Sequence, residues 1–202
     1  MTPQIKNLFV WGGLVFFLFL IGFSGCGSYN NMVTMDEAVT ANWQQVENQY
    51  QRRMDLIPNL VNTVQGYANF EKSTIIAVTE ARASVGQVKI DPGKLDDASI
   101  QKFKQAQDNL GSAISRLLVV SEQYPDLKAS ANFSQLMTDL AGTENRITKA
   151  RMDFNESAQA LNTYIRTFPR NIWAGMFGIE KRAYFESAEG SEKAPVVKFD
   201  TK

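Results

Sequence analysis

Residues 36–67 read DEAVTANWQQVENQYQRRMDLIPNLVNTVQGY, and their apolar side chains recur at spacings of three and four residues. This spacing predicts a helix with one buried face, because 3.6 residues complete a helical turn. Arg53 holds the one polar position on the apolar stripe. Pro58 lies within the helix and has no backbone N–H, so we expect a kink and an unpaired carbonyl at Met54. The stripe consists of Val39, Trp43, Val46, Tyr50, Ile57, Leu60, Val64 and Tyr67.

Two more long segments, residues 97–124 and 128–167, show the same helical spacing. Pro125 ends the first of them and Phe168-Pro169 ends the second, because proline cannot continue the hydrogen-bond ladder of a helix. The chain therefore predicts an all-α fold.

Residues 36–86 allow two arrangements. Gly66 can end one helix and Asn69 can cap the next, so that residues 70–86 fold back along the first helix. This predicts an elongated antiparallel up-and-down four-helix bundle. The alternative is three long helices. In it residues 36–86 form one continuous helix, and another subunit buries the apolar stripe of the N-terminal half of that helix.

The composition excludes several classes of protein. The 202 residues include 21 Lys and Arg against 21 Asp and Glu, without the basic excess of a nucleic-acid-binding protein. The absence of His removes the commonest general base and metal ligand. The single Cys excludes an intrachain disulfide and a thiolate-rich zinc site. We therefore expect no enzymatic activity, no metal, no cofactor and no nucleic-acid partner.

Residues 8–23 read LFVWGGLVFFLFLIGF and carry no charge. Extended to Cys26, the run approaches the roughly 20 apolar residues that cross a bilayer. Lys6 precedes the run and the next basic residue is Arg52, so the positive-inside rule keeps the N-terminus cytoplasmic and exports the rest. Residues 1–26 are thus a predicted membrane segment, and residues 27–169 are the predicted bundle.

Two outcomes for this segment stay open. It remains as a transmembrane anchor, which puts the bundle on the periplasmic side of the inner membrane. Alternatively Phe23-Ser24-Gly25-Cys26 is a lipobox at the end of a signal peptide, and Cys26 is the candidate acylation site of a lipoprotein that can reach the outer membrane. Both place the bulk of the chain outside the cytoplasm and attached to a membrane.

Residues 170–202 form the third predicted part. A short apolar stretch with basic flanks follows Pro169, and this composition is typical of a membrane interface. The alternative is a cap on the end of the bundle, and residues 186–202 are predicted to be an extended polar tail. The candidate residues for contact with the membrane or a partner are Ile172, Trp173, Met176 and Phe177.

Arg53 is predicted to be a buried arginine that bonds to a freed carbonyl or to a carboxylate on a facing helix. Glu144 is the preferred partner, because it lies at a similar height in the last long helix of the bundle. The alternative is an arginine that runs along the bundle edge with its charge in water.

Several motifs together resemble the LemA family over nearly the whole chain. They are residues 51–61 (QRRMDLIPNLV), 66–68 (GYA), 29–30 (YN), 142–147 (GTENRI) and 164–169 (YIRTFP). The positions singled out as family motif and structural residues are Arg52, Arg53, Asp55, Pro58, Asn59, Gly66, Tyr67, Glu144, Arg146 and Pro169.

The resemblance implies a bacterial, membrane-anchored helical bundle with its domain outside the cytoplasm and with no established enzymatic activity. Relatives are linked to membrane-stress responses, to neighbouring membrane metalloproteases and, in one branch, to magnetosome membrane formation.

The leading prediction is a non-enzymatic, membrane-tethered bundle that acts as an oligomeric scaffold at the extracytoplasmic membrane surface. The chain has more aromatic residues than a thin bundle needs, and this surplus predicts contact with a partner. The leading candidate for that partner is a second copy of the same chain. The alternative is a binding module or adaptor for a peptide, a lipid, a membrane protease or another membrane protein. The aromatic residues are Trp43, Tyr50, Tyr124, Phe133, Phe154 and Tyr164.

Overall fold

The computed structural model describes residues 3–66 and 71–186, and for residues 3–10 and 14–24 it describes the backbone alone. These residues form helices joined by loops and contain no strand, which confirms the all-α prediction. The helices are α1 (Pro3–Gln65), α2 (Lys72–Gly86), α3 (Asp97–Ser121), α4 (Pro125–Lys128), α5 (Ala131–Arg166) and α6 (Arg170–Phe177).

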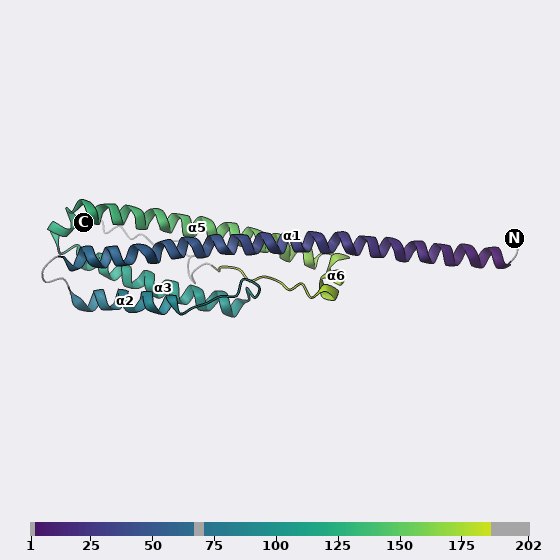
Figure 1. Cartoon of the computed structure of the whole chain (residues 1–202), viewed down its shortest axis with the longest axis horizontal. Coiled ribbons are helices and arrows are strands. Elements are labelled where there is room, and N and C mark those ends of the chain that lie inside the picture. Colours follow the sequence, from purple (N-terminus) through teal and green to yellow (C-terminus); the bar gives the residue numbers. More distant parts are fainter. Residues whose placement is uncertain (1–2, 67–70, 187–202) are drawn as a thin grey trace, which may run out of the picture.

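The region 36–86 contains two helices and not one. α1 ends at Gln65 and α2 begins at Lys72, while Tyr67 and Asn69 of the predicted turn lie outside the described residues. α1 packs along α5, and α2 packs along α3, each pair running in opposite directions (Figure 1). The structure therefore has the break that the four-helix arrangement requires.

Local capping explains where α3 and α5 begin. The Asp96 carboxylate accepts a hydrogen bond from the Ser99 amide at 2.8 Å, and the Ser130 hydroxyl lies 3.5 Å from the amide nitrogen of Phe133. Both side chains satisfy an amide that has no partner inside its own helix. α3 ends at Ser121, a few residues before the predicted limit, and Pro125 opens the short helix α4.

The N-terminal part of α1 projects beyond all the other helices (Figure 1). Its backbone is helical from Pro3 through Cys26 without a break. The side chains of the predicted membrane segment, residues 8–23, lie outside the described set except at residues 11–13, where Trp11 is exposed. Among the side chains that the structure does describe, none of the helices has a stretch long and apolar enough to cross a bilayer.

The buried side chains form two clusters along the bundle. The cluster farther from α6 draws its side chains from α1 through α5, including Ile57, Val78 and Leu117. In the cluster nearer α6, α2 is replaced by residues 178–186, which we call the C-terminal segment. α2 has 15 residues and covers only about 22 Å of the bundle, so this segment completes the core that α2 does not reach.

Trp43 is the centre of the cluster near α6 and is fully buried. Its ring lies 5.2 Å from Phe103, 5.7 Å from Phe154 and 6.0 Å from Phe185, measured between ring centroids. Tyr50 also packs on Phe103, at 5.0 Å. These rings come from α1, α3, α5 and the C-terminal segment, so an aromatic cluster joins four parts of the chain.

This burial removes the argument that the aromatic residues are surplus. Trp43, Tyr50, Phe133 and Phe154 are all buried within one chain. These four side chains are therefore not available to a partner, and for Trp43 and Phe154 the C-terminal segment supplies part of the packing. Tyr124 and Tyr164 are half-buried, so for them contact with a partner stays a prediction. Homo-oligomerisation stays a prediction without this support.

Candidate functional site

The described residues contain no arrangement of three or more Cys, Asp or Glu side chains that could hold a metal ion. Burial raises the pKa of Glu47, which lies one turn from Trp43 on α1. Burial also raises the pKa of Tyr50, whose ring lies 5.0 Å below the guanidinium carbon of Arg53. Tyr50 belongs to the packed core and Glu47 is half-buried beside it, so we read these shifts as effects of folding.

Arg53 joins three helices at the middle of the bundle. Its Nη1 donates to Oε2 of Glu144 on α5 at 3.2 Å, and its Nη2 donates to the backbone oxygen of Gln107 on α3 at 3.0 Å. The predicted contact with Glu144 is therefore present. The Arg53 side chain is only 8% exposed, so the alternative with its charge in water is wrong.

In the ion pair between Arg53 and Glu144 only Arg53 is buried, because the Glu144 side chain is 59% exposed. The buried partner of Arg53 is Gln107, which offers both its backbone oxygen and its side-chain oxygen. Nε of Arg53 is also buried and has no hydrogen-bond partner among the described residues. Arg53 therefore depends more on Gln107 than on the carboxylate that the sequence indicated.

Arg53→Leu is expected to lower the free energy of unfolding by about 1.5–3 kcal/mol, the range for buried hydrogen bonds to a charged group. Glu144→Leu is expected to cost less than about 1 kcal/mol, because this carboxylate is exposed. Thermal melts of the two variants and of the double variant measure both values. A loss in Glu144→Leu as large as in Arg53→Leu would show that the ion pair, and not Gln107, holds Arg53.

The carbonyl that Pro58 frees has a different partner from the one expected. The backbone oxygen of Met54 accepts a hydrogen bond from Nε of Arg82 on α2, at 3.2 Å. Arg82 thus compensates for the missing amide and ties α2 to α1. Sequence reasoning missed it because the helical spacing does not show which face of α2 meets α1.

The other motif residues lie on the surface. Asp55 accepts a hydrogen bond from the Gln51 amide group at 2.7 Å, and the Asn59 backbone oxygen accepts one from Thr63 at 2.8 Å. Tyr67 lies outside the described residues. The exposed motif positions are Arg52, Asp55, Pro58, Asn59, Gly66, Arg146 and Pro169, and the structure does not bring them together with Arg53 in one site.

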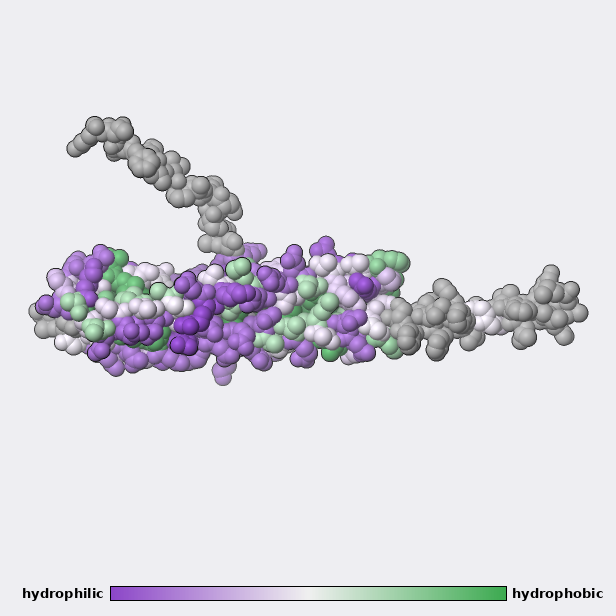
Figure 2. Space-filling view, turned by 90° about the horizontal axis from the view of Figure 1, so that it is seen from above, coloured by the Kyte–Doolittle hydropathy of each residue, from purple (hydrophilic) through white to green (hydrophobic). Residues whose placement is uncertain are grey.

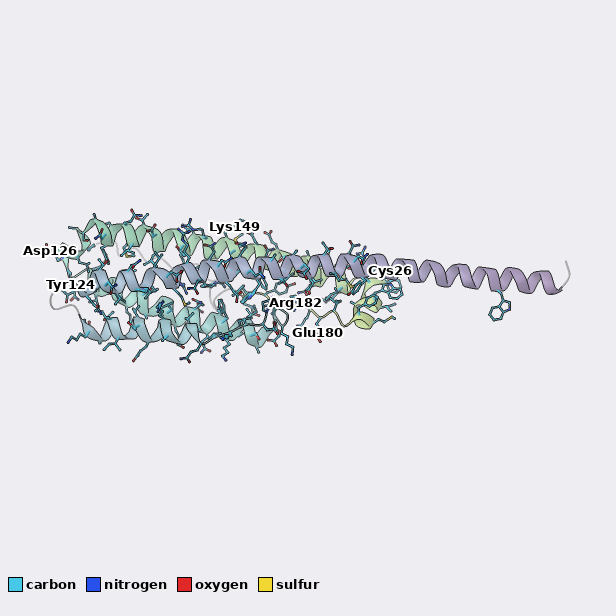
Figure 3. The ribbon with its side chains drawn as sticks, viewed as in Figure 1. Cys26, Tyr124, Asp126, Lys149, Glu180 and Arg182 are labelled. Atoms are coloured by element: carbon cyan, nitrogen blue, oxygen red, sulfur yellow. The ribbon has the colours of Figure 1, made fainter. Side chains whose placement is uncertain are left out.

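Arg182 binds the C-terminal segment to α1 (Figure 3). Its Nε and Nη2 donate to the two carboxylate oxygens of Asp36, each at 2.8 Å, and its Nη1 donates to the Gly93 carbonyl at 2.7 Å. The Arg182 side chain is 13% exposed. Sequence reasoning treated Arg182 as a basic flank of the apolar stretch, whereas its charge is already paired.

Two asparagines of α5 hold the backbone of the C-terminal segment. The Asn162 side chain accepts from the Arg182 amide at 2.8 Å and donates to the Arg182 carbonyl at 2.7 Å. Asn155 makes the same pair of bonds to Phe185, at 2.8 and 2.9 Å. The two side chains therefore replace the neighbouring strand that an extended segment would otherwise need.

α6 packs on α1 at the end of the bundle from which the N-terminal part of α1 projects (Figure 1). The Trp173 ring covers Gly25, where a Cβ atom would meet the ring at 3.2 Å. Phe177 packs edge-on against Tyr29, with 4.8 Å between ring centroids. Gly25 thus permits the close approach of α6, and Trp173 and Phe177 are the residues that dock it.

The outer face of α6 is apolar and exposed. Ile172 is 53% exposed and Met176 is 69% exposed, and the two lie one turn apart. Phe168, just before α6, is 76% exposed, and Cys26 is exposed on the neighbouring turn of α1 (Figure 3). Hydrophobic side chains gather at this end of the bundle (Figure 2).

These features define an elongated helical protein whose arginine contacts, those of Arg53 and Arg182, join its helices and its C-terminal segment. Exposed apolar side chains lie at the end of the bundle from which α1 projects, at Phe168, Ile172 and Met176. Residues 42–199 match the sequence profile of the LemA family, so the chain belongs to the LemA family.

Three relatives illustrate the range of similarity. Magnetosome protein MamQ of Magnetospirillum gryphiswaldense is 30% identical, with 84% of this chain and 68% of the relative aligned. Magnetosome protein MamQ 2 of Paramagnetospirillum magneticum is 29% identical with the same coverage. Protein LemA of Metamycoplasma hominis is 26% identical, over 87% of this chain and 78% of the relative. None of these names denotes an enzyme.

Proposed function

We propose that the protein is a non-enzymatic scaffold tethered to a membrane, with its bundle on the extracytoplasmic surface. Residues 8–23 of α1 lie in the bilayer, and α6 rests on the surface of the same membrane. The observation that carries this proposal is the position of α6. It docks on α1 at Gly25 and Tyr29, directly after the uncharged run, and keeps Ile172 and Met176 exposed.

The geometry of α1 supports a helical anchor over cleavage at Cys26. The helix continues through this position, and Trp173 packs on the residue before it. The relatives named as magnetosome proteins support a role in organising a membrane, as the resemblance to the LemA family implied. A role in membrane stress and assembly into homo-oligomers belong to the same proposal. Light scattering of the full chain in mild detergent distinguishes an oligomeric scaffold from a monomeric tether.

Site-specific fluorescence tests the position of α6. The full chain carrying Cys26→Ser and Met176→Cys is labelled with an environment-sensitive dye and reconstituted in lipid vesicles. The dye is expected to shift to the blue and to be quenched by spin-labelled lipids, because the exposed face of an interfacial helix lies at the acyl boundary.

Val119→Cys in the same background is the matched control. Val119 is 66% exposed and lies near the end of α3 that is remote from α6 (Figure 1). Its dye is expected to show neither the blue shift nor the quenching. Equal quenching at both positions, or none at Met176→Cys, would contradict the proposed contact between α6 and the membrane.

A further inference from the structure

Two arginines lie beside α6 without an acidic partner. Arg166 is in the last turn of α5 and is exposed, and Arg170 is the first residue of α6 and is half-buried. Neither arginine forms an ion pair within the part of the chain that the structure describes. The described chain therefore does not neutralise these two positive charges.

The parts of the chain around α6 carry no negative charge of their own. Residues 7–35 and 166–179 together contain two basic residues, which are the two arginines, and no acidic residue. Asp36 lies 11 positions beyond Gly25, about 16 Å along α1, and its carboxylate is bound by Arg182. The end of the bundle at α6 is therefore positively charged.

The position of α6 brings this charge close to the uncharged run of α1. Trp173 packs on Gly25, two residues after the run ends at Phe23. Arg170 lies within one turn of Trp173, because the whole of α6 is only about 12 Å long. In the proposed function residues 8–23 lie in the bilayer, so Arg170 lies at the level of the lipid headgroups.

The guanidinium group of Arg170 is held in place and keeps its hydrogen-bond donors. Its central carbon lies over the ring of Tyr164 on α5, at 4.2 Å from the ring centroid. Among the described residues Arg170 donates no hydrogen bond, so its N–H groups remain available to a ligand. A guanidinium group with free N–H donors suits a phosphate, which can accept two parallel bonds from it.

Exposed apolar side chains accompany the two arginines. Phe168 lies between them in the sequence and is 76% exposed, and Ile172 follows Arg170 by two residues and is 53% exposed. Basic and apolar groups side by side match the boundary of a membrane, where phosphates lie next to acyl chains. We propose that Arg166 and Arg170 bind the phosphate groups of anionic phospholipids in the membrane on which α6 rests.

This preference for anionic lipid rests on the proposed function and adds the class of lipid to it. The fold produces the preference, because α5 and α6 carry the arginines to a part of α1 that has no charge. The positive-inside rule considers the residues that flank the span in sequence, and the first basic residue after the span is Arg52.

Spin-labelled lipids with two different headgroups test the proposal. The full chain with Cys26→Ser and Met176→Cys carries the dye and is reconstituted in mixed vesicles of phosphatidylcholine and phosphatidylglycerol. One of the two lipids bears the spin label, at the same low content in each sample. Quenching by phosphatidylglycerol is expected to exceed quenching by phosphatidylcholine by about 5-fold to about 25-fold, the factors for one and for two basic residues at an anionic surface.

Three variants separate the two arginines from other causes. Arg166→Gln/Arg170→Gln is expected to bring the ratio of the two quenching values close to one. Arg166→Lys/Arg170→Lys keeps both charges and is expected to keep most of the preference, since an ammonium group also binds phosphate. Arg116→Gln/Arg146→Gln removes the same charge from exposed positions on α3 and α5 and is expected to leave the ratio unchanged.

Each contrary result has a distinct meaning. Equal quenching by both lipids in the parent protein would overturn the preference and leave the contact of α6 with the membrane intact. Quenching by neither lipid would remove the proposed function and this proposal together. A Lys variant that loses the preference as completely as the Gln variant would assign the effect to packing on Tyr164. An equal loss in Arg116→Gln/Arg146→Gln would assign it to net charge, and either result would overturn the proposal.

Discussion

Replacing Trp43 with Ala is expected to lower the free energy of unfolding by about 3–5 kcal/mol, the range for truncation of a buried aromatic side chain. Trp43 is fully buried and packs against rings from α3, α5 and the C-terminal segment. No single helix can close the space that its indole fills, so the cavity persists. Urea unfolding of the full chain in mild detergent, followed by circular dichroism, measures the loss.

Val119→Ala is the control for this measurement, because Val119 is 66% exposed. Its effect is expected to stay within about 0.5 kcal/mol. Trp43→Phe adds a graded test, since it keeps an aromatic ring in the cluster and removes the indole N–H, which lies near the Glu47 carboxylate. A Trp43→Ala variant as stable as Val119→Ala would mean that the aromatic cluster does not hold the bundle together.

Asn162→Ala is expected to lower the free energy of unfolding by about 2–4 kcal/mol. It removes the partners of the Arg182 amide and carbonyl, which are part-buried, and a polar group left unpaired costs about 1–3 kcal/mol when fully buried. It also removes the bond from Nδ2 of Asn162 to the Tyr184 hydroxyl. The damage is expected to be local at first, because the bonds connect α5 to the C-terminal segment and not to another helix.

Limited proteolysis with mass spectrometry distinguishes this local effect from global unfolding. Cleavage within residues 178–186 is expected to accelerate in Asn162→Ala before any helix is cut. Asn145→Ala, an exposed position on the same helix, is the control and is expected to leave both the melting temperature and the cleavage pattern unchanged. If residues 178–186 resist proteolysis equally in both variants, the asparagine contacts do not retain the segment.

The helices and one contact between them could be predicted from the sequence because both depend on periodic spacing. The apolar stripe placed Arg53 on a buried face, and comparable heights in two antiparallel helices indicated Glu144. The contacts of Arg82, Asn162 and Arg182 could not be predicted in this way. They depend on helix orientation or on an extended segment, and neither produces a period in the sequence.

The aromatic residues show the same limitation. Trp43 and Phe154 were assigned to a partner because the four predicted helices alone did not need them. Phe185, which packs on both rings, lies in a stretch with no helical pattern. A core completed by an irregular segment is therefore underestimated by reasoning from helical spacing.

α1 consists of 63 residues, about 95 Å of uninterrupted helix. A continuous helix resists bending and twisting, so it acts mechanically as a shaft between its two ends. Rotation of the end that carries residues 8–23 would turn the whole bundle with it, since no flexible joint absorbs the torque. Inserting one residue into this helix would rotate its two ends relative to each other by about 100° about the helix axis. The number of residues between the uncharged run, which ends at Phe23, and the docking position of α6 at Gly25 therefore fixes how the bundle is rotated about the axis of α1 relative to that run.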